Sequence, residues 1–430
     1  MHLDTADTSS TDPVPGDSAP HSGVDAPDLR VFVFALFFVF GGITSLNDVI
    51  IPKLKDLFTL SYGQAMLVQS AFFAAYFLVS LPASSIVRRI GYLRSASLGV
   101  LTMAIGCLLF IPASRSGLFA VFLVALFVLA AGITIVQVVA NPLISVLGAP
   151  RTAHSRLTFA QAFNSLGTTV FPFFGSILIL GALASVAPDP KDLAALSAYR
   201  TQETQVVVNT YLGLAVALLL LSLVIWLRRH RLRESHGKPM RLVHALDLLR
   251  QTRFGWGAAC IFLYVGAEVA IGSLLVNYLM QASTLGLAEQ AAGKHVPYYW
   301  GGALIGRFIG AWLLRIASPG KVLGTAASGS ILLIVASMAT QGSVSGWTLL
   351  AVGLCNSIMF PTIFSLASEG LGRRAAEGSG LICVAIVGGA IIPPLTGHLA
   401  DLTNLRTALC LPALCYAVIA AYGVYARKPL

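Results

Sequence analysis

Long apolar runs recur along almost the whole chain and are separated by short polar segments. Each run has close to 20 residues, about the length that an α-helix needs to cross the hydrocarbon core of a bilayer. We predict twelve membrane-spanning helices, at residues 31–52, 66–87, 95–113, 118–146, 156–183, 207–227, 254–281, 297–316, 321–340, 346–368, 377–398 and 406–426. The pattern therefore predicts an all-α membrane protein.

The predicted spans form two sets of six that resemble each other. The glycine and proline spacing Gly167-x4-Pro172-x2-Gly175 in the fifth span recurs as Gly389-x4-Pro394-x2-Gly397 in the eleventh. Internal repeats of this kind are typical of transporters built from two pseudo-symmetric bundles. We expect a disordered N-terminal tail, a six-helix bundle, a basic linker and a second six-helix bundle, at residues 1–29, 30–227, 228–253 and 254–430.

Composition and charge agree with a protein that lies in a lipid bilayer. Hydrophobic residues make up 56% and charged residues 11%, whereas soluble domains carry about 25% charge. The net charge of +10 comes from arginines and lysines that gather in alternate loops. This distribution predicts cytoplasmic termini and a cytoplasmic linker, and it argues against nucleic acid as a partner. We find no catalytic set, metal-ligand spacing or cofactor motif, so we do not expect an enzyme. We expect the working unit to be a monomer.

One carboxylate, Asp48, lies inside the first apolar run, beside Thr44, Ser45 and Asn47. An ionised carboxylate in mid-membrane costs about 3 kcal/mol on insertion scales, so such a residue usually faces a cavity. We predict that Asp48 gathers a coupling cation next to a polar solute that Asn47 helps to bind. The alternative is an aspartate at a helix end near the membrane surface.

Amide side chains occur in pairs in the fourth and fifth spans. Gln137 and Asn141 are four residues apart, and Gln161 and Asn164 are three apart, so each pair shares a helix face. Amides supply both donors and acceptors, which suits the hydroxyl groups of a sugar. The alternative is that they hold helices together, which contributes about 0.6–2 kcal/mol per bond in membranes.

The second half has its own polar positions. Glu268 is a second carboxylate at membrane depth, and Arg307 in the next span is a possible ion-pair partner. The alternative is that Glu268 contacts the solute or the cation. Trp300 lies seven residues before Arg307, near the same helix face, and could offer an apolar platform to a sugar ring. Further binding candidates are Tyr264, Asn277 and Asn356.

These stretches together carry a resemblance that runs from about residue 30 to the C-terminus. The chain resembles the fucose and glucose/galactose branch of the major facilitator superfamily. The matching stretches are Leu46-Asn-Asp-Val-Ile-Ile-Pro52, Gln137-Val-Val-Ala-Asn-Pro142, Arg156-Leu-Thr-Phe-Ala-Gln-Ala-Phe-Asn-Ser-Leu-Gly167, Tyr264-Val-Gly-Ala-Glu268, Gly301-Gly-Ala-Leu-Ile-Gly-Arg307 and Asn356-Ser-Ile-Met-Phe-Pro361. The resemblance implies a twelve-helix inner-membrane hexose importer coupled to a cation, with Asp48 at the family carboxylate.

Two departures from the family pattern refine this expectation. Fucose permeases have a glutamate where this chain has Gln137, and in this respect the chain looks like glucose/galactose permeases. Because an amide cannot titrate, proton handling falls on Asp48, alone or with Glu268. In the loop after the second span, Arg88 stands where the superfamily has an acid, which weakens the assumption that the usual gating salt bridge forms there. The remaining gating candidates are Arg89, Arg94 and Arg307.

We therefore predict a secondary active transporter of a bacterial inner membrane that imports a neutral hexose with a proton by alternating access. Sodium coupling is an alternative, because Ser45 and Asn47 could help Asp48 to ligate a small cation. An N-acetylhexosamine is an alternative substrate. A transporter-like receptor that binds sugar without moving it is a remote one.

Overall fold

The described part of the chain is helical throughout. The computed structural model describes residues 27–58, 62–116, 118–175, 193–230 and 245–427. Ten stretches in these residues are long and apolar enough to cross a membrane, and the two other predicted spans correspond to α6 and α11, described below. Among the described residues there is no β-strand, so the predicted all-α class is confirmed.

The first half of the chain forms one group of helices, which we call the N bundle. Its elements are α1 (Pro27–Phe58), α2 (Tyr62–Ile90), α3 (Tyr92–Leu108), α4 (Phe110–Ser116), α5 (Phe119–Val146), η1 (Pro150–Thr152), α6 (Ala153–Gly175) and α7 (Leu193–Leu227). Helices α3 and α5 pack closely because glycines line their contact. A Cβ atom added at Gly132 would lie 2.4 Å from the backbone nitrogen of Met103, so a larger residue would separate the two helices.

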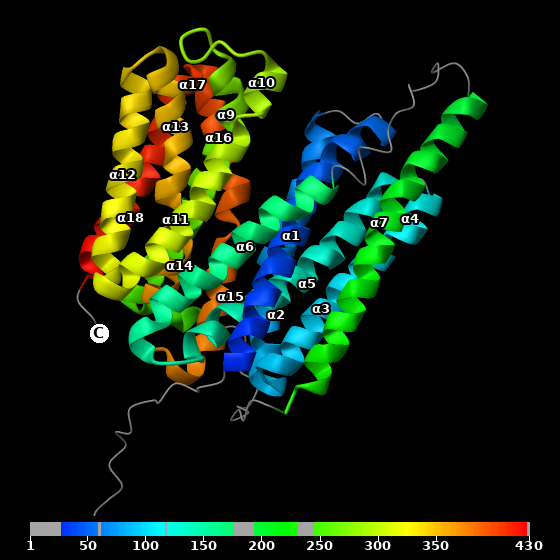
Figure 1. The fold of residues 1–430 in the computed structure, drawn as a ribbon, viewed down its shortest axis with the longest axis horizontal. Helices are drawn as coiled ribbons and strands as arrows, with labels where there is room; N and C mark the ends of the chain where they lie inside the picture. The colour runs from blue at the N-terminus through cyan, green and yellow to red at the C-terminus, as the bar shows by residue number, and fades with distance from the viewer. Residues whose placement is uncertain (1–26, 59–61, 117, 176–192, 231–244, 428–430) are drawn as a thin grey trace, which may run out of the picture.

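The second half forms the C bundle, which lies beside the N bundle in Figure 1. Its elements are η3 (Leu246–Arg250), α9 (Thr252–Met280), α10 (Glu289–Gly293), α11 (Val296–Ile316), α12 (Pro319–Ala339), α13 (Gly342–Asn356), α14 (Met359–Ser368), η4 (Gly372–Arg374), α15 (Ala375–Ala385), α16 (Gly388–Leu402), α17 (Leu405–Ala408) and α18 (Cys410–Tyr425).

Three predicted spans are each divided into two helices by a proline. The breaks at Leu109, Ile358 and Leu409 lie three residues before prolines 112, 361 and 412. Proline has no N–H, and its ring displaces the carbonyl four residues earlier, so the helix is interrupted at that point. The break between α13 and α14 leaves carbonyl groups that other side chains bind, as described below.

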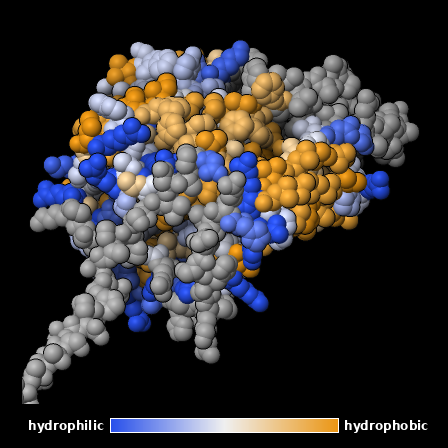
Figure 2. Space-filling view, turned by 60° about the horizontal axis from the view of Figure 1, so that its bottom comes forward, coloured by the Kyte–Doolittle hydropathy of each residue, from blue (hydrophilic) through white to orange (hydrophobic). Residues whose placement is uncertain are grey.

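The outer surface of the molecule matches a lipid environment. Apolar side chains on α7 and α11 are exposed, among them Leu219, Leu220, Leu223, Ile305, Ile309 and Trp312. Figure 2 shows hydrophobic flanks and hydrophilic residues gathered at the end turned toward the viewer. We call this the basic end, defined by Arg88, Arg156, Arg315 and Arg374.

The two bundles meet in the half of the molecule nearer the basic end. There α6 packs against α11 and α14, and α15 packs against α2 and α5. Figure 1 shows the ribbons of the two bundles converging at this end and diverging toward α10 and the far end of α1.

Candidate functional site

The amides of the N bundle lie in its interior and form hydrogen bonds with each other and with neighbouring helices. Gln161 of α6 donates from Nε2 to Oδ1 of Asn141 on α5, at 3.4 Å. Tyr76 of α2 donates its hydroxyl to Oε1 of Gln137 on α5, at 2.9 Å. Asn164 donates from Nδ2 to the carbonyl of Phe37 on α1, at 3.4 Å. The structure therefore links the amide residues through α1, α2, α5 and α6.

This network leaves specific hydrogen-bonding groups open. Asn141 is completely buried, and its Nδ2 has no hydrogen-bond partner. Gln137 has its oxygen occupied by Tyr76, so its Nε2 remains as a donor. Since a buried donor without a partner costs about 1–3 kcal/mol, the cluster is suited to receive oxygen atoms from a bound polar molecule.

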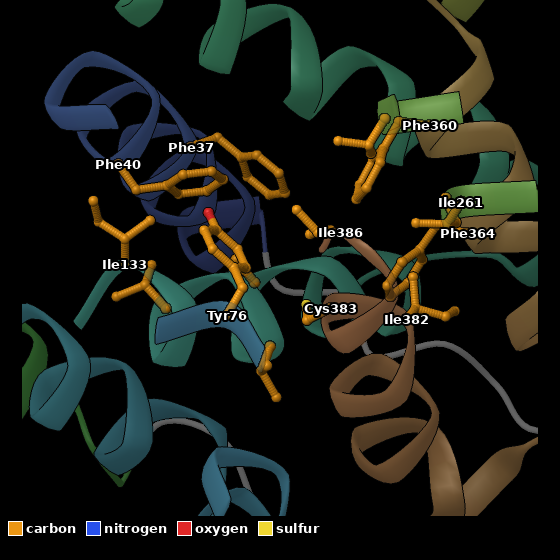
Figure 3. Packing of buried hydrophobic residues seen from close by; sticks show 14 of the residues in the cluster. Phe37, Phe40, Tyr76, Ile133, Ile261, Phe360, Phe364, Ile382, Cys383 and Ile386 are labelled. Carbon is orange, nitrogen blue, oxygen red and sulfur yellow. The ribbon is translucent and has the colours of Figure 1, made fainter. Parts of the chain in front are cut away.

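Tyr76 occupies a position between the bundles. It is nearly fully buried and packs with Phe72 of its own helix, with ring centroids 5.5 Å apart. Figure 3 shows Phe37, Phe40 and Tyr76 of the N bundle lying across from Cys383 of α15. The residue was missed by the sequence analysis, because a single tyrosine in an apolar span has no spacing that marks it.

The C bundle has a second polar network around Glu268. The hydroxyl of Tyr264 donates to Oε1 of Glu268 at 2.8 Å and lies 3.0 Å from the carbonyl oxygen of Asn356. Asn356 donates from Nδ2 to the hydroxyl of Tyr299 at 2.8 Å and accepts from Ser330 at 3.4 Å. Asn356 is completely buried, so its amide holds α11, α12 and α13 together at the helix break.

The other two candidates of the C bundle are more accessible. Trp300 is 42% exposed and contacts Tyr299 edge-on, with ring centroids 5.1 Å apart. Asn277 is exposed on α9. It lies nine positions after Glu268, a rise of about 13 Å along the helix axis. Trp300 thus presents an open aromatic surface in the same bundle as the Glu268 network.

Arg307 connects the two bundles and does not form the ion pair that was considered for it. Its Nη1 donates to the backbone carbonyl of Gln161 at 2.8 Å and to the hydroxyl of Ser165, both on α6 of the N bundle. Its Nε donates to the carbonyl of Ser357 at 3.2 Å. Pro361 cannot donate to that carbonyl, so Arg307 replaces the missing helix bond. Among the ion pairs of the described residues, none joins Arg307 to Glu268.

Ion pairs join the bundles at the basic end. Arg88 of α2 pairs with Glu377 of α15, which also accepts from Arg374 at 2.8 Å. A second group has Glu369 between Arg253 and His154, with His154 Nε2 at 2.9 Å from the carboxylate.

Arg88, in the last turn of α2, therefore forms a salt bridge whose acid does not come from its own loop. The acid is Glu377 of the other bundle, whose pairing with Arg88 no local motif could indicate. Of the neighbouring basic residues, Arg89 is exposed and Arg94 is half-buried.

Hydrogen bonds between the bundles add to these ion pairs. Ser155 at the start of α6 donates to the carbonyl of Ala311 at 2.7 Å. Ser379 of α15 donates to the carbonyl of Val138 at 2.9 Å. Pro142 cannot donate to that carbonyl, which lies four residues earlier, so Ser379 supplies the missing bond from the other bundle. The basic end is thus held closed by polar contacts on several helices.

The predicted cation site lies toward the far end of α1. Asn47 and Asp48 lie in the α1 helix, but their side chains are outside the described part of the structure. One turn earlier, Ser45 is buried and donates to the carbonyl of Gly42 at 2.8 Å.

The comparison with protein families settles which family has this architecture. The model of the Major Facilitator Superfamily matches residues 33–385. The chain belongs to the major facilitator superfamily. It is therefore a multi-pass membrane transporter and not an enzyme.

Known proteins place the chain near two groups within the superfamily. It is 47% identical over 393 residues to the glucose/galactose transporter of Brucella abortus, covering 91% of this chain and 92% of that protein. It is 35% identical over 401 residues to the L-fucose-proton symporter of Escherichia coli K12, covering 90% of each. These matches confirm the resemblance drawn from the motifs.

A solved structure agrees with the fold over nearly the whole chain. The crystal structure of FucP, a transporter of the same superfamily in the outward conformation, matches with a TM-score of 0.84 and 32% sequence identity. The match covers 94% of this chain and 99% of that one.

Proposed function

We propose that this chain imports a neutral hexose together with a proton by alternating access. The proposal draws on the names of its relatives, a glucose/galactose transporter and an L-fucose-proton symporter. It also draws on the open hydrogen-bonding groups of the N bundle. The observation that carries most weight is the buried Asn141 amide, whose Nδ2 has no partner.

The amide cluster supplies what a sugar needs. Gln137 and Asn141 offer donors, and the half-buried Asn164 retains its side-chain oxygen as an acceptor. A hexose has several hydroxyl groups that each donate and accept, so it can satisfy all of these groups at once. Trp300 would provide an apolar surface for one face of the ring, with Asn277 as a further position. Tyr264 and Asn356, by contrast, are bonded within the C bundle.

Orientation in the membrane follows from the arginines. The positive-inside rule puts the basic end in the cytoplasm of a bacterial cell, with the termini and the linker 228–253 on the same side. The bundles are 30–227 and 254–430, and the working unit is a monomer. In the conformation described here, the polar contacts at Arg88, Ser155 and Glu369 close the cytoplasmic side.

We assign to Asp48 the coupling of proton movement to sugar transport. If its carboxylate accepts a proton from outside, the loaded carrier crosses to the inward state as a neutral species and releases the proton inside. One charge moved through 100 mV supplies about 2.3 kcal/mol, enough for roughly fiftyfold accumulation. Glu268 is the second carboxylate of the site, and it accepts a hydrogen bond from Tyr264.

The decisive experiment uses Asp48→Asn, which removes the charge and keeps the shape. We expect concentrative uptake of hexose in whole cells to collapse, while exchange of labelled sugar across sealed vesicles continues. If the variant still concentrates sugar, Asp48 is not the coupling site. If even the parent protein shows no counterflow of any hexose, the chain does not transport hexoses.

Two further choices are decided in the same vesicles. Proton and sodium gradients imposed separately identify the coupling cation, because only the cation that moves with sugar drives accumulation. A competition panel of glucose, galactose, fucose and N-acetylhexosamines then identifies the substrate. We expect glucose or galactose to compete best.

A further inference from the structure

Arg307 is a charged side chain whose hydrogen bonds go to neutral oxygens. Two of its acceptors, the Gln161 carbonyl and the Ser165 hydroxyl, belong to the other bundle, and the third is the Ser357 carbonyl of its own bundle. A half-buried guanidinium at membrane depth needs acceptors for its protons, and losing them is costly. Two of its three hydrogen bonds therefore last only while α6 and α11 stay together.

Alternating access, which the proposed function entails, separates these helices. When the basic end opens, Arg307 loses Gln161 and Ser165 but keeps its bond to Ser357, because that residue moves with α11. The guanidinium then needs a new acceptor within the C bundle.

Glu268 is the carboxylate placed to be that acceptor. Tyr264, which donates to Glu268, also lies within hydrogen-bond distance of the carbonyl of Asn356, next to the Ser357 carbonyl that Arg307 binds. Arg307 and Tyr264, the hydrogen-bond partner of Glu268, thus contact the carbonyl groups of consecutive residues at one helix break. Tyr299 donates its hydroxyl to the backbone carbonyl of Glu268 at 3.4 Å, which leaves the carboxylate itself to Tyr264.

We propose that Arg307 is a charge switch with two alternative sets of acceptors. It binds the α6 oxygens at Gln161 and Ser165 when the basic end is closed, and it binds the carboxylate of Glu268 when that end is open. Glu268 then acts as the counter-ion of the open state, which leaves the transported proton to Asp48. Gln161 connects this switch with the amide cluster, because its backbone carbonyl accepts from Arg307 and its side chain donates to Asn141.

The test measures how often the basic end opens. Ser84 is a suitable reporter, because it is buried on α2 against Gly380 of α15 and donates only within its own helix. Ser84→Cys is placed in a full-length chain whose six native cysteines are replaced by alanine. The rate of thiol labelling in inside-out vesicles then reports opening, and it requires no transport.

We expect Ser165→Ala to raise the labelling rate and Glu268→Gln to lower it, each by about tenfold, since each removes a charge-assisted bond from one state. With Arg307→Gln also present, Glu268→Gln should have no further effect. Asp401→Asn also turns a carboxylate into an amide, but at an exposed position of α16, so it should leave the labelling rate unaltered.

Two outcomes of the labelling experiment would contradict the proposed switch. If Glu268→Gln leaves labelling unchanged, or lowers it equally with and without Arg307, then Glu268 is not the alternative partner. Sugar counterflow measured in the parent protein separates this failure from that of the proposed function, because labelling can succeed where counterflow is absent. Size-exclusion profiles of each variant exclude misfolding as the cause.

Discussion

The two bundles use their buried asparagines in different ways. In the C bundle, Asn356 is saturated, with its amide bonded to Tyr299 and Ser330. In the N bundle, Asn141 is equally buried, but its Nδ2 has no partner. A saturated buried amide stabilises a helix junction, whereas an unsatisfied one lowers stability unless a ligand completes it. This difference supports the proposal that the N bundle binds the solute and that the C bundle responds to it.

Proline breaks show the same division. Pro142 in the N bundle leaves the Val138 carbonyl to Ser379, which comes from the other bundle. Pro361 in the C bundle leaves the Ser357 carbonyl to Arg307 of its own bundle. The carbonyl groups freed by these two prolines thus have different partners: one bonds to a serine of the other bundle, and one bonds to an arginine of its own bundle.

The largest expected difference is between Asn141→Ala and Asn356→Ala. If Asn141 donates to the sugar as proposed, Asn141→Ala should raise the half-saturation concentration for hexose at least tenfold. Thermal stability should fall little, since the only hydrogen bond lost among the described residues is the long one from Gln161, at 3.4 Å. Asn356→Ala should lower the melting temperature of the purified protein, because the loss leaves Tyr299 and Ser330 without their partner. Counterflow and thermal unfolding, measured on both variants, check this.

The contrast between the two asparagines would be wrong if Asn141→Ala and Asn356→Ala gave each other's expected results. A melting temperature that falls in Asn141→Ala, with unchanged sugar affinity, would make that residue a structural amide. Gln205, an exposed amide on α7, provides a control substitution that should alter neither measurement.

A smaller difference is expected between two tyrosine-to-phenylalanine changes. Tyr76→Phe keeps the ring but removes the hydroxyl that orients Gln137, so the affinity for hexose should fall about fivefold, as expected for one neutral hydrogen bond. Tyr264→Phe frees Glu268 instead, so it should slow concentrative uptake and leave the half-saturation concentration unchanged. Initial rates of uptake over a range of sugar concentrations separate the two effects. Equal losses of affinity in both would remove the distinction between the bundles.

The arrangement of the helices could be predicted from sequence because hydrophobic length and charge distribution act locally. Twelve apolar runs and their basic loops required no knowledge of packing. Helix spacing also brought together residues on one face, such as Gln137 and Asn141. The proline interruptions follow from a local rule as well, although the carbonyl groups that they free acquire partners only in the folded protein.

The contacts between bundles could not be predicted in this way. Glu377 and Arg88 are far apart in sequence, and their pairing depends on how α2 meets α15. The same holds for Arg307, whose neighbour in the sequence pattern was Glu268 but whose partners in the closed state are on α6. In a transporter that changes conformation, a side chain can exchange one hydrogen-bonding partner for another. A sequence pattern does not tell which partner it has in which conformation.

The smallest expected effect concerns Trp300, the exposed aromatic residue of the C bundle. If its ring covers one face of the sugar, Trp300→Ala removes apolar contact at about 25 cal/mol per Å², and the affinity should fall about threefold to fivefold. Trp300→Phe should restore most of it. Trp256 is exposed to a similar degree, 48% against 42%, and lies in α9 beside Tyr425 near the basic end, so Trp256→Ala should leave sugar affinity unchanged. Equal effects of the two alanine changes in counterflow would show that Trp300 only anchors its helix at the membrane surface, and sugar recognition would then rest with the amides of the N bundle.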